Sequence, residues 1–548
     1  MGSKQAGDRA GGRTLADYPN HPFAGLDVAS LLAERARQRG AHPFLLWEPF
    51  VGESACWSYA AFAAQAARTA AGLFRRGVRP GDKILIHLDN CPESLFAWYG
   101  CAILGAVAVT TNARSSGEEL GYFAGHSGAI AAMTQPRFAE LVAAHCPDLR
   151  WIAVTATDNG APPAAGQAPA AGDSFAALDG DPADLPRRAP DPLAPVGVQY
   201  TSGTTSRPKG VLWTHANALW GARINALHQS LVPEDVHLTY LPLFHTNAQA
   251  YSVLAALWVG ASVVVQPRFS ASRFWPVSLK HRCTWTSLVP FCVRALMEHP
   301  VPLQHAYRLW GNALCAPPTD AHFRVKTIGW WGMTETITHG IVGDPWSENR
   351  SMMIGRAAPE YGISVRDEEG REVAPGETGD LLVKGLRGLS LFQEYLDNPE
   401  ATAASFDEQG WFRTGDRLIR HADGFLQFAD RAKDMLKVGG ENVAASEIER
   451  VILTVPGVRE VAVVGRKHPM LDEVPIALII PDEAAGVPAA ALLAAVSAAC
   501  AAALADFKRP HEVRLAAEFP RSTLEKIAKA QLRRQIEREA VETTAPSR

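Results

Sequence analysis

The sequence predicts an α/β fold for the large N-terminal part of the chain and a separate, smaller α+β domain at its C-terminus. Short β-rich runs alternate with helical segments, an order typical of parallel strands joined by crossover helices. The chain has 548 residues, which is too long for one compact core. The alternation changes near Asp430, so we assign residues 1–429 to the first domain and residues 430–548 to the second.

The first predicted elements are two helices and a strand–helix–strand unit. Leu31–Arg39 and Ala60–Arg76 have helical composition, and Gly77 can end the second helix. The runs Lys83–Leu88 and Ala106–Thr111 are β-rich and flank a helical span. Strand, helix and strand in this order predict parallel pairing and a layer of helices on a sheet.

The middle of the chain begins with a stretch of different composition. Thr155–Pro195 is rich in Ala, Pro, Gly and Asp, and we interpret it as a long surface excursion without chemistry. A strand at Val196–Tyr200 and a helix from Ala216 follow it. Further strands are predicted at Val236–Leu241, Ser262–Pro267, Trp285–Pro290 and Gly379–Gly385, with a hairpin turning at Glu369–Gly370.

The C-terminal part combines strands with helices. Val461–Gly465 and Pro475–Ile480 are β runs, and an alanine-rich run, Ala489–Ala505, and a basic C-terminal helix follow. Alanine is weakly apolar and Ser497 interrupts the run, so it predicts a soluble helix rather than a membrane span.

Composition excludes several classes of protein. Hydrophobic residues make up 47% and charged residues 20%, and the formal net charge is −4, which argues against a nucleic-acid-binding surface. The N-terminus has no apolar segment of a secretory signal, and no stretch predicts a transmembrane helix. The eight scattered cysteines predict thiols in a reducing, cytoplasmic environment. Four of them lie among apolar neighbours and are predicted core residues: Cys91, Cys101, Cys283 and Cys292.

The loop from Thr201 to Gly210 predicts a phosphate site. It holds five Ser or Thr hydroxyls, two glycines and Lys209 directly after a strand. Glycines allow backbone N–H groups to face an anion, and a lysine supplies a point charge. The spacing is not that of a P-loop, because Pro208 stands five positions after Gly203 and Val211 follows Gly210. The alternative is an ordinary polar surface turn.

Together with five later segments, this loop resembles the adenylate-forming superfamily of acyl-CoA synthetases, luciferases and peptide-synthetase adenylation domains. The resemblance runs from about Ser30 to Arg533. It implies a large domain of stacked αβ subdomains with a β subdomain, and a small, mobile C-terminal domain. It also implies ATP, Mg²⁺, coenzyme A and a small carboxylic acid as ligands. The five segments, in the family's order, are Leu241–His245, Gly329–Thr336, Gly410–Asp416, Asp430–Val443 and Pro520–Lys529.

The resemblance assigns roles around the nucleotide. Trp331 is expected to stack on adenine, Thr334 to bind the α-phosphate and Glu335 to hold Mg²⁺. Asp416 is expected to accept bonds from the ribose hydroxyls, with help from Arg431. Alone, Glu335 could be a solvated charge and Asp416 a turn residue. The implied ATP-binding set is Thr201, Ser202, Gly203, Thr204, Thr205, Lys209, Trp331, Gly332, Thr334, Asp416 and Arg431.

Catalysis is expected to depend on cations, because negative charge builds on the phosphates as a carboxylate attacks the α-phosphorus. Lys526 matches the family's lysine that bridges the substrate carboxylate and the phosphate. Glu525 stands where the family usually has glycine, so the local geometry can differ here. Lys529 matches the second, non-catalytic lysine. The implied catalytic set is Lys526, Thr334, Glu335 and Lys209.

The resemblance also places the other two substrates. His245 and Gly311 are expected to border the acyl group, although the wording around Gly311 departs from the family and a lone histidine is often a core residue. Asp430 is the expected hinge between the two half-reactions. Gly439 and Gly440 are expected to line the pantetheine tunnel, since a narrow passage tolerates no side chain. An ordinary hairpin turn is the alternative for these two glycines.

Several phrases, among them Phe269–Trp275, Met333–Asp344 and Phe392–Ala403, resemble bacterial crotonobetaine/carnitine–CoA ligases most. The expected function is therefore an ATP-dependent acyl-CoA ligase acting through an acyl-adenylate on a carnitine-like or medium-sized organic acid. Three alternatives stay open: a fatty-acid–CoA ligase, an adenylation enzyme that loads a separate carrier protein, and a catalytically impaired binding protein. The oligomeric state is also open, a homodimer included.

Overall fold

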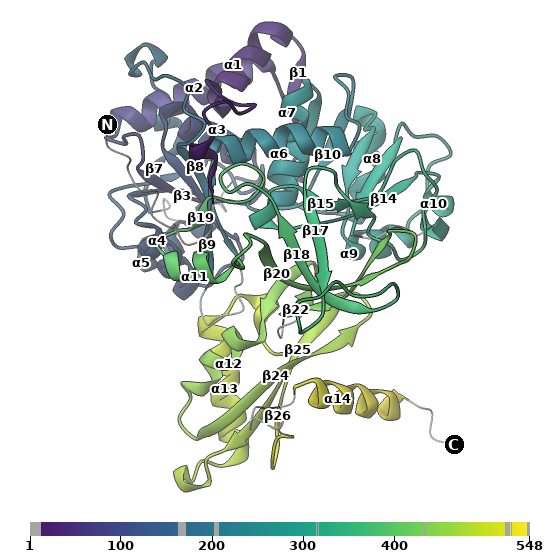
Figure 1. Ribbon diagram of the computed structural model, residues 1–548. Helices are drawn as coiled ribbons and strands as arrows, with labels where there is room; N and C mark the ends of the chain where they lie inside the picture. Colours follow the sequence, from purple (N-terminus) through teal and green to yellow (C-terminus); the bar gives the residue numbers. More distant parts are fainter. Residues whose placement is uncertain are drawn as a thin grey trace, which may run out of the picture. The chain divides into compact units, whose positions relative to one another are not determined.

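The computed structural model (Figure 1) describes residues 13–162, 171–201, 208–313, 315, 317–431, 435–520, 527 and 529–544. The chain divides into two compact units. The first comprises the residues up to Ala113, Phe123–Tyr200 and Gly210–Asp430, and the second comprises Arg114–Tyr122, Thr201–Lys209 and the residues from Arg431 onward. Two short segments from early in the sequence therefore belong to the second unit, which the sequence did not indicate.

The first unit contains an eight-stranded sheet with a largely parallel order, as predicted. Strands β3 and β4 pair in parallel around helix α3. The order across the sheet is β19 (Glu394–Tyr395), β9 (Lys209–Thr214), β8 (Pro195–Thr201), β4 (Val107–Thr110), β3 (Lys83–His87), β5 (Ala131–Thr134), β6 (Ile152–Val154) and β7 (Asp173–Ser174).

A second, nine-stranded sheet carries three of the predicted site residues, Gly311, Trp331 and Gly332. Its strands β11, β10, β12, β13 and β14 are parallel, so their carboxyl ends meet at one edge. The order is β16 (Arg356–Ala357), β15 (His339–Val342), β14 (Thr327–Gly332), β13 (Leu309–Asn312), β12 (Trp285–Ser287), β10 (Val236–Thr239), β11 (Ser262–Val265), β1 (Pro43–Trp47) and β2 (Ala55–Ser58).

A four-stranded sheet completes the first unit. It is antiparallel where β17 meets β18 and where β18 meets β20. The turn predicted at Gly370 is present, with φ of 81° at that residue. The strand order is β17 (Gly362–Arg366), β18 (Thr378–Lys384), β20 (Phe412–Arg420) and β21 (Leu426–Arg431).

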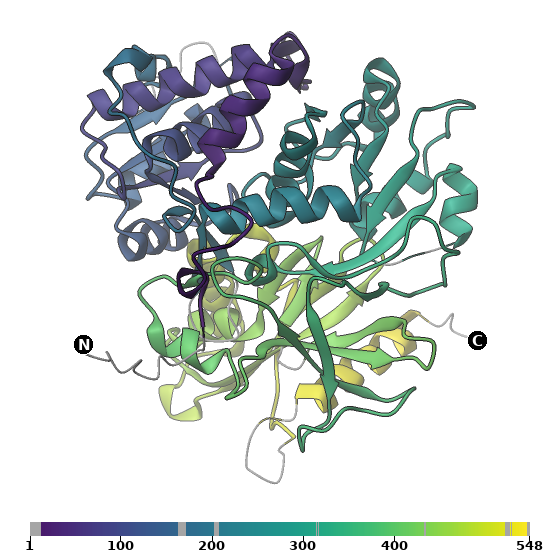
Figure 2. The same cartoon turned by 45° about the horizontal axis from the view of Figure 1, so that its top comes forward.

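Helices cover the two large sheets, and some of them begin at a side chain that caps the first turn. Asp27 and Ser30 form a capping box at α1, and the Thr214 hydroxyl accepts from the Asn217 N–H at α6. Figure 2 shows α1, α2 and α3 side by side at the purple end of the chain. The helices of this part are α1 (Val28–Arg39), α2 (Tyr59–Arg75), α3 (Pro92–Leu104), α4 (Gly117–Ser127), α5 (Pro136–His145), α6 (His215–His228), the π-helical η4 (Asn247–Leu254), α7 (Ala255–Val259), α8 (Ala271–His281), α9 (Pro290–Met297), α10 (Pro317–Phe323) and α11 (Pro399–Ala404).

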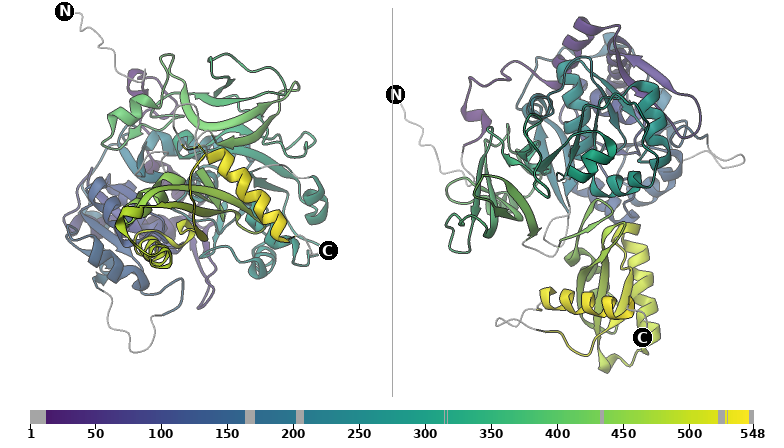
Figure 3. Two further views of the ribbon diagram at one scale, coloured as in Figure 1. Left: turned by 90° about the horizontal axis from the view of Figure 1, so that it is seen from below. Right: turned by 90° about the vertical axis from the view of Figure 1, so that its right-hand side faces the viewer.

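The second unit is an α+β body, as predicted. One sheet runs in the order β23 (Glu441–Ala444), β22 (Met435–Val438), β25 (Asp472–Pro481) and β24 (Val458–His468), with β26 (Glu512–Leu515) beside β25. Helices α12 (Ala445–Leu453) and α13 (Ala489–Ala503) pack on one face, while α14 (Lys529–Thr544) packs on the other. Figure 3 shows α14 lying across the strands. The alanine-rich run is thus a helix that buries Leu492, Val496 and Cys500.

Buried polar contacts hold the segment Arg114–Tyr122 within the second unit. Lys508 lies 2.8 Å from the Glu447 carboxylate and also contacts Glu119. The Ser116 hydroxyl donates to the Ala503 carbonyl at 2.6 Å. Because an isolated buried charge is costly, this ion cluster explains why Arg114–Tyr122 belongs to this unit.

One expectation about the fold is wrong. Thr155–Pro195 is not only a surface excursion, because Phe175 and Leu178 are buried and β7 extends the first sheet. Two apolar residues, Phe175 and Leu178, hardly change the composition of a stretch dominated by Ala, Pro, Gly and Asp, so the composition did not indicate their burial. The four cysteines predicted for the core are all buried. Among the described residues, no helix is both long and apolar enough to cross a membrane.

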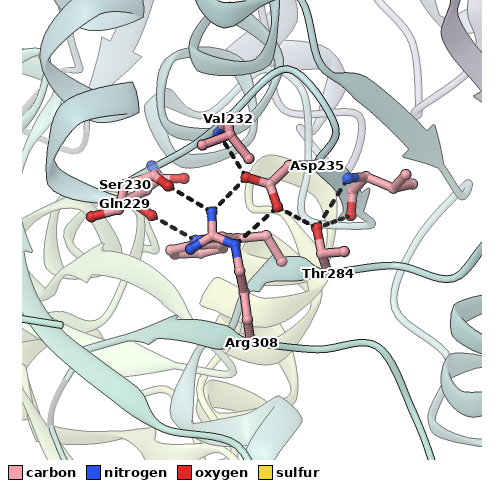
Figure 4. A network of polar contacts seen from close by, with 8 residues as sticks. Gln229, Ser230, Val232, Asp235, Thr284 and Arg308 are labelled. Atoms are coloured by element: carbon pink, nitrogen blue, oxygen red, sulfur yellow. Dashed lines mark hydrogen bonds and ion pairs between the residues drawn. The ribbon is translucent and has the colours of Figure 1, made fainter. Parts of the chain in front are cut away.

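The buried Asp235 carboxylate joins segments that precede three strands of the nine-stranded sheet, away from the carboxyl ends of those strands (Figure 4). Its ion-pair partner, Arg308, is exposed. The Arg308 Nε donates to Asp235 Oδ1 at 2.9 Å, and the Thr284 hydroxyl donates to the same oxygen at 2.7 Å. The Val232 N–H donates to Asp235 Oδ2 at 2.8 Å. These bonds join the segments before β10, β12 and β13.

Candidate functional site

The end of β14 gathers several of the predicted nucleotide residues. Trp331 and Gly332 are its last two residues, and the short helix η5 (Thr334–Thr336) follows at once. Glu335 is 3% exposed. The carboxyl ends of parallel strands are where open α/β sheets bind ligands.

Trp331 and Asp416 are brought together, although they lie on different sheets. The indole Nε1 of Trp331 donates to Asp416 Oδ2 at 2.8 Å. Both side chains are buried, at 7% and 2% exposure. Asp416 lies on β20, and its backbone N–H donates to the Thr414 hydroxyl at 3.1 Å. This second bond fixes the backbone at Asp416. The base-stacking and ribose-binding residues of the sequence hypothesis are therefore neighbours.

Glu335 is held by a residue that the sequence analysis did not single out. The Tyr395 hydroxyl donates to Glu335 Oε1 at 2.9 Å, and the Phe392 N–H donates to the Glu335 carbonyl at 2.8 Å. Burial and the neighbouring carboxylate raise the pKa of Tyr395 well above its ordinary value, so the phenol stays a hydrogen-bond donor. Tyr395 lies in the segment Phe392–Ala403, which the sequence analysis used only for its resemblance to crotonobetaine/carnitine–CoA ligases and not as part of the site.

A second overlooked residue positions Thr334. The Trp213 indole N–H donates to the Thr334 carbonyl at 2.9 Å. Trp213 lies on β9, the strand that begins at Lys209. Thr334 is half-buried, and this bond links its backbone to β9, the strand that follows the hydroxyl-rich loop. No motif pointed to this tryptophan, because the contact joins residues 121 positions apart.

The hydroxyl-rich loop is described only at its ends. Thr201 is the last residue of β8 and Lys209 the first of β9. Ser202, Gly203, Thr204 and Thr205 lie outside the described residues, as do Glu525 and Lys526. Their roles stay predictions from the sequence. Lys529 is described and lies 2.7 Å from Glu449.

Of the two residues expected to border the acyl group, Gly311 lies on β13 and His245 lies two residues before η4. The His245 ring contacts the Phe244 ring with centroids 4.5 Å apart. A β-carbon on Gly311 would come within 1.7 Å of the Trp330 indole. Only glycine fits there, and the ring of Trp330 occupies the space above it.

The residues expected at the hinge and the tunnel lie at defined backbone positions. Asp430 and Arg431 end β21, and the division between the two units falls between them. Gly439 and Gly440 form the two-residue turn between β22 and β23, with φ of 59° and 91°. Two positive φ values suit glycine and a tight hairpin. The backbone of these two glycines is therefore that of an ordinary hairpin turn. A turn of this kind can still line the pantetheine tunnel, so that role stays a prediction.

The donor set suits a metal brought by a phosphate ligand. Among the described residues, no group of three His, Cys, Asp or Glu side chains could hold a metal ion. Mg²⁺ commonly binds through one or two carboxylates together with substrate phosphates. The buried carboxylate of Glu335, oriented by Tyr395, fits that requirement.

Comparisons with known proteins identify the family of the chain. The family model described as AMP-binding enzyme matches residues 32–396, and the model of the AMP-binding enzyme C-terminal domain matches residues 447–526. The chain is 35% identical over 494 residues to a crotonobetaine/carnitine–CoA ligase of Escherichia coli O7:K1, covering 87% of this chain and 93% of that protein.

Solved structures show the same fold. A double mutant of o-succinylbenzoate CoA synthetase from Bacillus subtilis, bound with a product analogue, matches with a TM-score of 0.78 and 26% identity, covering 92% of this chain and 98% of that one. A fatty acyl CoA synthetase of Mycobacterium tuberculosis matches with a TM-score of 0.66 and 26% identity, covering 94% and 99%. The family model over residues 32–396 and the relative at 35% identity show that the chain belongs to the AMP-binding enzyme family.

Proposed function

We propose that this protein is an ATP-dependent acyl-CoA ligase. A carboxylate oxygen of the acid attacks the α-phosphorus of ATP, and the bond to the β-phosphate breaks to release pyrophosphate. The sulfur of coenzyme A then attacks the acyl carbon, and AMP leaves. The overall products are acyl-CoA, AMP and pyrophosphate. MatB of Rhodopseudomonas palustris, solved with bound ATP, shares the fold with a TM-score of 0.66 and 25% identity, covering 93% of this chain and 99% of that one, which supports ATP as the nucleotide.

The hydrogen bond between Trp331 and Asp416 carries the proposal, together with the Glu335 carboxylate four residues after Trp331. These residues supply an aromatic ring, a buried carboxylate for ribose and a second buried carboxylate for a metal. In our assignment Trp331 stacks on adenine, Asp416 accepts from the ribose, and Thr334 donates to the α-phosphate. Glu335 would hold Mg²⁺, which neutralises phosphate charge when bound. Lys209 and Lys526 supply the remaining positive charge.

The acid is proposed to be carnitine-like. The curated relatives at 35% identity carry the name crotonobetaine/carnitine–CoA ligase, whereas the fatty acyl CoA synthetase among the solved structures is 26% identical. We therefore place a fatty acid second. His245 and Gly311 are assigned to the acyl end of the site.

A panel of acids tests this proposal. Purified protein with ATP and Mg²⁺ should exchange pyrophosphate into ATP only when a suitable acid is present, and coenzyme A should multiply the release of AMP. The panel should include carnitine, crotonobetaine, short acids and fatty acids. No acid-dependent exchange with any of them would contradict the proposal. Exchange without stimulation by coenzyme A, but with transfer to a carrier protein, would favour the carrier-loading alternative.

The role of Lys526 can be tested separately. Lys526→Ala should abolish formation of the adenylate while leaving thioester formation from a supplied acyl-adenylate largely intact. Lys529→Ala is the matched control, because this lysine pairs with Glu449 and is assigned no catalytic role. Equal loss of both half-reactions in Lys526→Ala would exclude the proposed role.

The second half-reaction is assigned to residues of the second unit. Gly439 and Gly440 are proposed to line the passage of the pantetheine arm, and Asp430 to be the hinge. Gly440→Leu should slow thioester formation more than adenylate formation, with Gly486→Leu, another positive-φ glycine, as a control for backbone strain.

We place the reaction in the cytoplasm, since the eight cysteines, all within the described part of the chain, form no disulfide.

A further inference from the structure

A column of stacked rings crosses one face of the nine-stranded sheet. His237 of β10 stacks on Trp285 of β12 at 5.4 Å, Trp285 on Trp330 of β14 at 5.7 Å, and Trp330 on His339 of β15 at 4.2 Å. The planes of successive rings differ by 16°, 6° and 10°. Strand β13 lies within this span, and Trp330 reaches across it because Gly311 has no side chain.

Helix η4 closes the space beside the column. It packs against β10 and β12, and its Tyr251 ring lies 4.2 Å from His339 and 5.8 Å from Trp330. All five rings are at most 6% exposed. A long acyl chain entering between His245, just before η4, and Gly311 would have to pass through these rings. Close-packed interiors leave no room for such a passage.

The face of the sheet that carries the ring column is not purely apolar at the end of β12. Ser287 is the last residue of β12 and pairs in register with Gly311. Its side chain is 3% exposed, and its hydroxyl has no hydrogen-bond partner among the described residues. On η4 the buried Asn247 Oδ1 is likewise without a partner in the described part of the chain. A buried polar atom left unsatisfied costs about 1–3 kcal/mol, so such atoms point to a ligand or bound water.

We infer that the acid substrate is short and carries a hydroxyl or other hydrogen-bonding group, with the ring column closing the site behind it and Ser287 and Asn247 binding its polar group. The inference rests on the proposed ligase function and defines its substrate class. It makes Trp330 and Ser287 residues that determine specificity, for chain length and for polarity respectively.

Chain length is tested with butyrate, octanoate and dodecanoate in the acid-dependent release of AMP with coenzyme A. The wild-type protein should prefer butyrate. Trp330→Leu should raise the ratio of kcat/KM for octanoate over butyrate about tenfold or more. The control is Trp310→Leu, a tryptophan of β13 buried in another apolar cluster, which should leave the ratio unchanged. If Trp330→Leu fails to fold, His339→Ala opens the same column.

Two results would overturn the chain-length inference. One is a wild-type protein that uses octanoate or dodecanoate as efficiently as butyrate, and the other is a Trp330→Leu ratio equal to that of Trp310→Leu. Both leave the ligase function standing. Absence of AMP formation with every acid, carnitine and crotonobetaine included, would instead remove the proposed function itself.

Polarity is tested with β-hydroxybutyrate against butyrate. Ser287→Ala should lower the ratio of kcat/KM for β-hydroxybutyrate over butyrate about fivefold to tenfold. The control is Ser278→Ala, which replaces an equally buried serine of α8 that forms a hydrogen bond with Tyr307 and should not change this ratio. An equal loss for both acids in Ser287→Ala would show that the hydroxyl binds structural water instead, and would overturn its assigned role.

Discussion

The indole nitrogen of Trp331 and the carboxylate of Asp416 are 2.8 Å apart, although 85 residues separate them in the sequence. One residue ends β14 of the nine-stranded sheet and the other lies on β20 of the four-stranded sheet. The bond therefore ties two sheets together at the place assigned to adenosine. It also orients the indole plane before any ligand arrives, which lowers the entropy lost on binding.

Replacing Trp331 by Phe should weaken ATP binding. The ring remains able to stack, but the bond to the Asp416 carboxylate is lost, and such charge-assisted bonds contribute about 1.5–3 kcal/mol. We expect the KM for ATP to rise about tenfold or more, with a smaller change in the KM for the acid. Trp310→Phe, in a separate cluster, is the control. Equal changes in both variants would show a general effect on folding.

Tyr395→Phe should alter the dependence on Mg²⁺. The hydroxyl that donates to Glu335 Oε1 is removed without a change of ring packing. Loss of a residue that orients a metal ligand commonly costs tenfold to a hundredfold in affinity or activity, so we expect about a tenfold rise in the Mg²⁺ concentration for half-maximal rate. Titration of Mg²⁺ at constant ATP measures it, with Tyr307→Phe as control. A lower kcat with an unchanged Mg²⁺ midpoint would argue against a metal at Glu335.

Asp235→Ala should destabilise the protein and leave its substrate constants unchanged. Asp235 is 3% exposed and accepts from Arg308, Thr284 and the Val232 N–H. Without the carboxylate, the hydroxyl and the N–H that donate to it lose their partner inside the protein, at a cost of about 1–3 kcal/mol. Asp423→Ala breaks an exposed pair with Arg350 and should leave the thermal midpoint nearly unchanged, because solvent screens such pairs. Thermal unfolding compares the two, and equal midpoints would contradict the burial argument.

Acid should destabilise the first unit through His237. Burial lowers the pKa of His237 to about 4, while the unfolded chain has the ordinary value near 6.5. Between these values the unfolded state binds more protons, so stability falls as pH decreases, by about 1.4 kcal/mol per pH unit. His237→Gln should reduce the fall in thermal midpoint between about pH 6.5 and 5, relative to His145→Gln on the surface. An unchanged fall would contradict the assignment.

The sequence was sufficient for the elements and motifs that are local in the chain. The strand–helix–strand around α3 and the aromatic end of β14 depend on neighbouring residues, and both are found as expected. The hairpin turn at Gly439 and Gly440, which was the alternative to their expected place in the pantetheine tunnel, is equally local. Contacts between distant segments were out of reach. Tyr395 and Glu335 are 60 positions apart, and no motif relates them.

The ring column was also out of reach of the sequence. Tryptophans and histidines on separate strands form a stack only when strand order and register are known, and β13 intervenes between Trp285 and Trp330. The family resemblance implies that Gly311 borders the acyl group, which stays a prediction, but the reason for a glycine there, the indole above it, is visible only in the structure. Phe175 and Leu178 were missed because the surrounding composition resembles a surface loop.

The acyl-adenylate is the central claim, and an isotope experiment tests it most directly. The acid is labelled with the heavy oxygen isotope in its carboxylate and incubated with the protein, ATP, Mg²⁺ and coenzyme A. Because a carboxylate oxygen attacks the α-phosphorus, one labelled oxygen should appear in AMP and none in pyrophosphate, as measured by mass spectrometry. Unlabelled AMP, or ADP formed with labelled phosphate, would contradict the account.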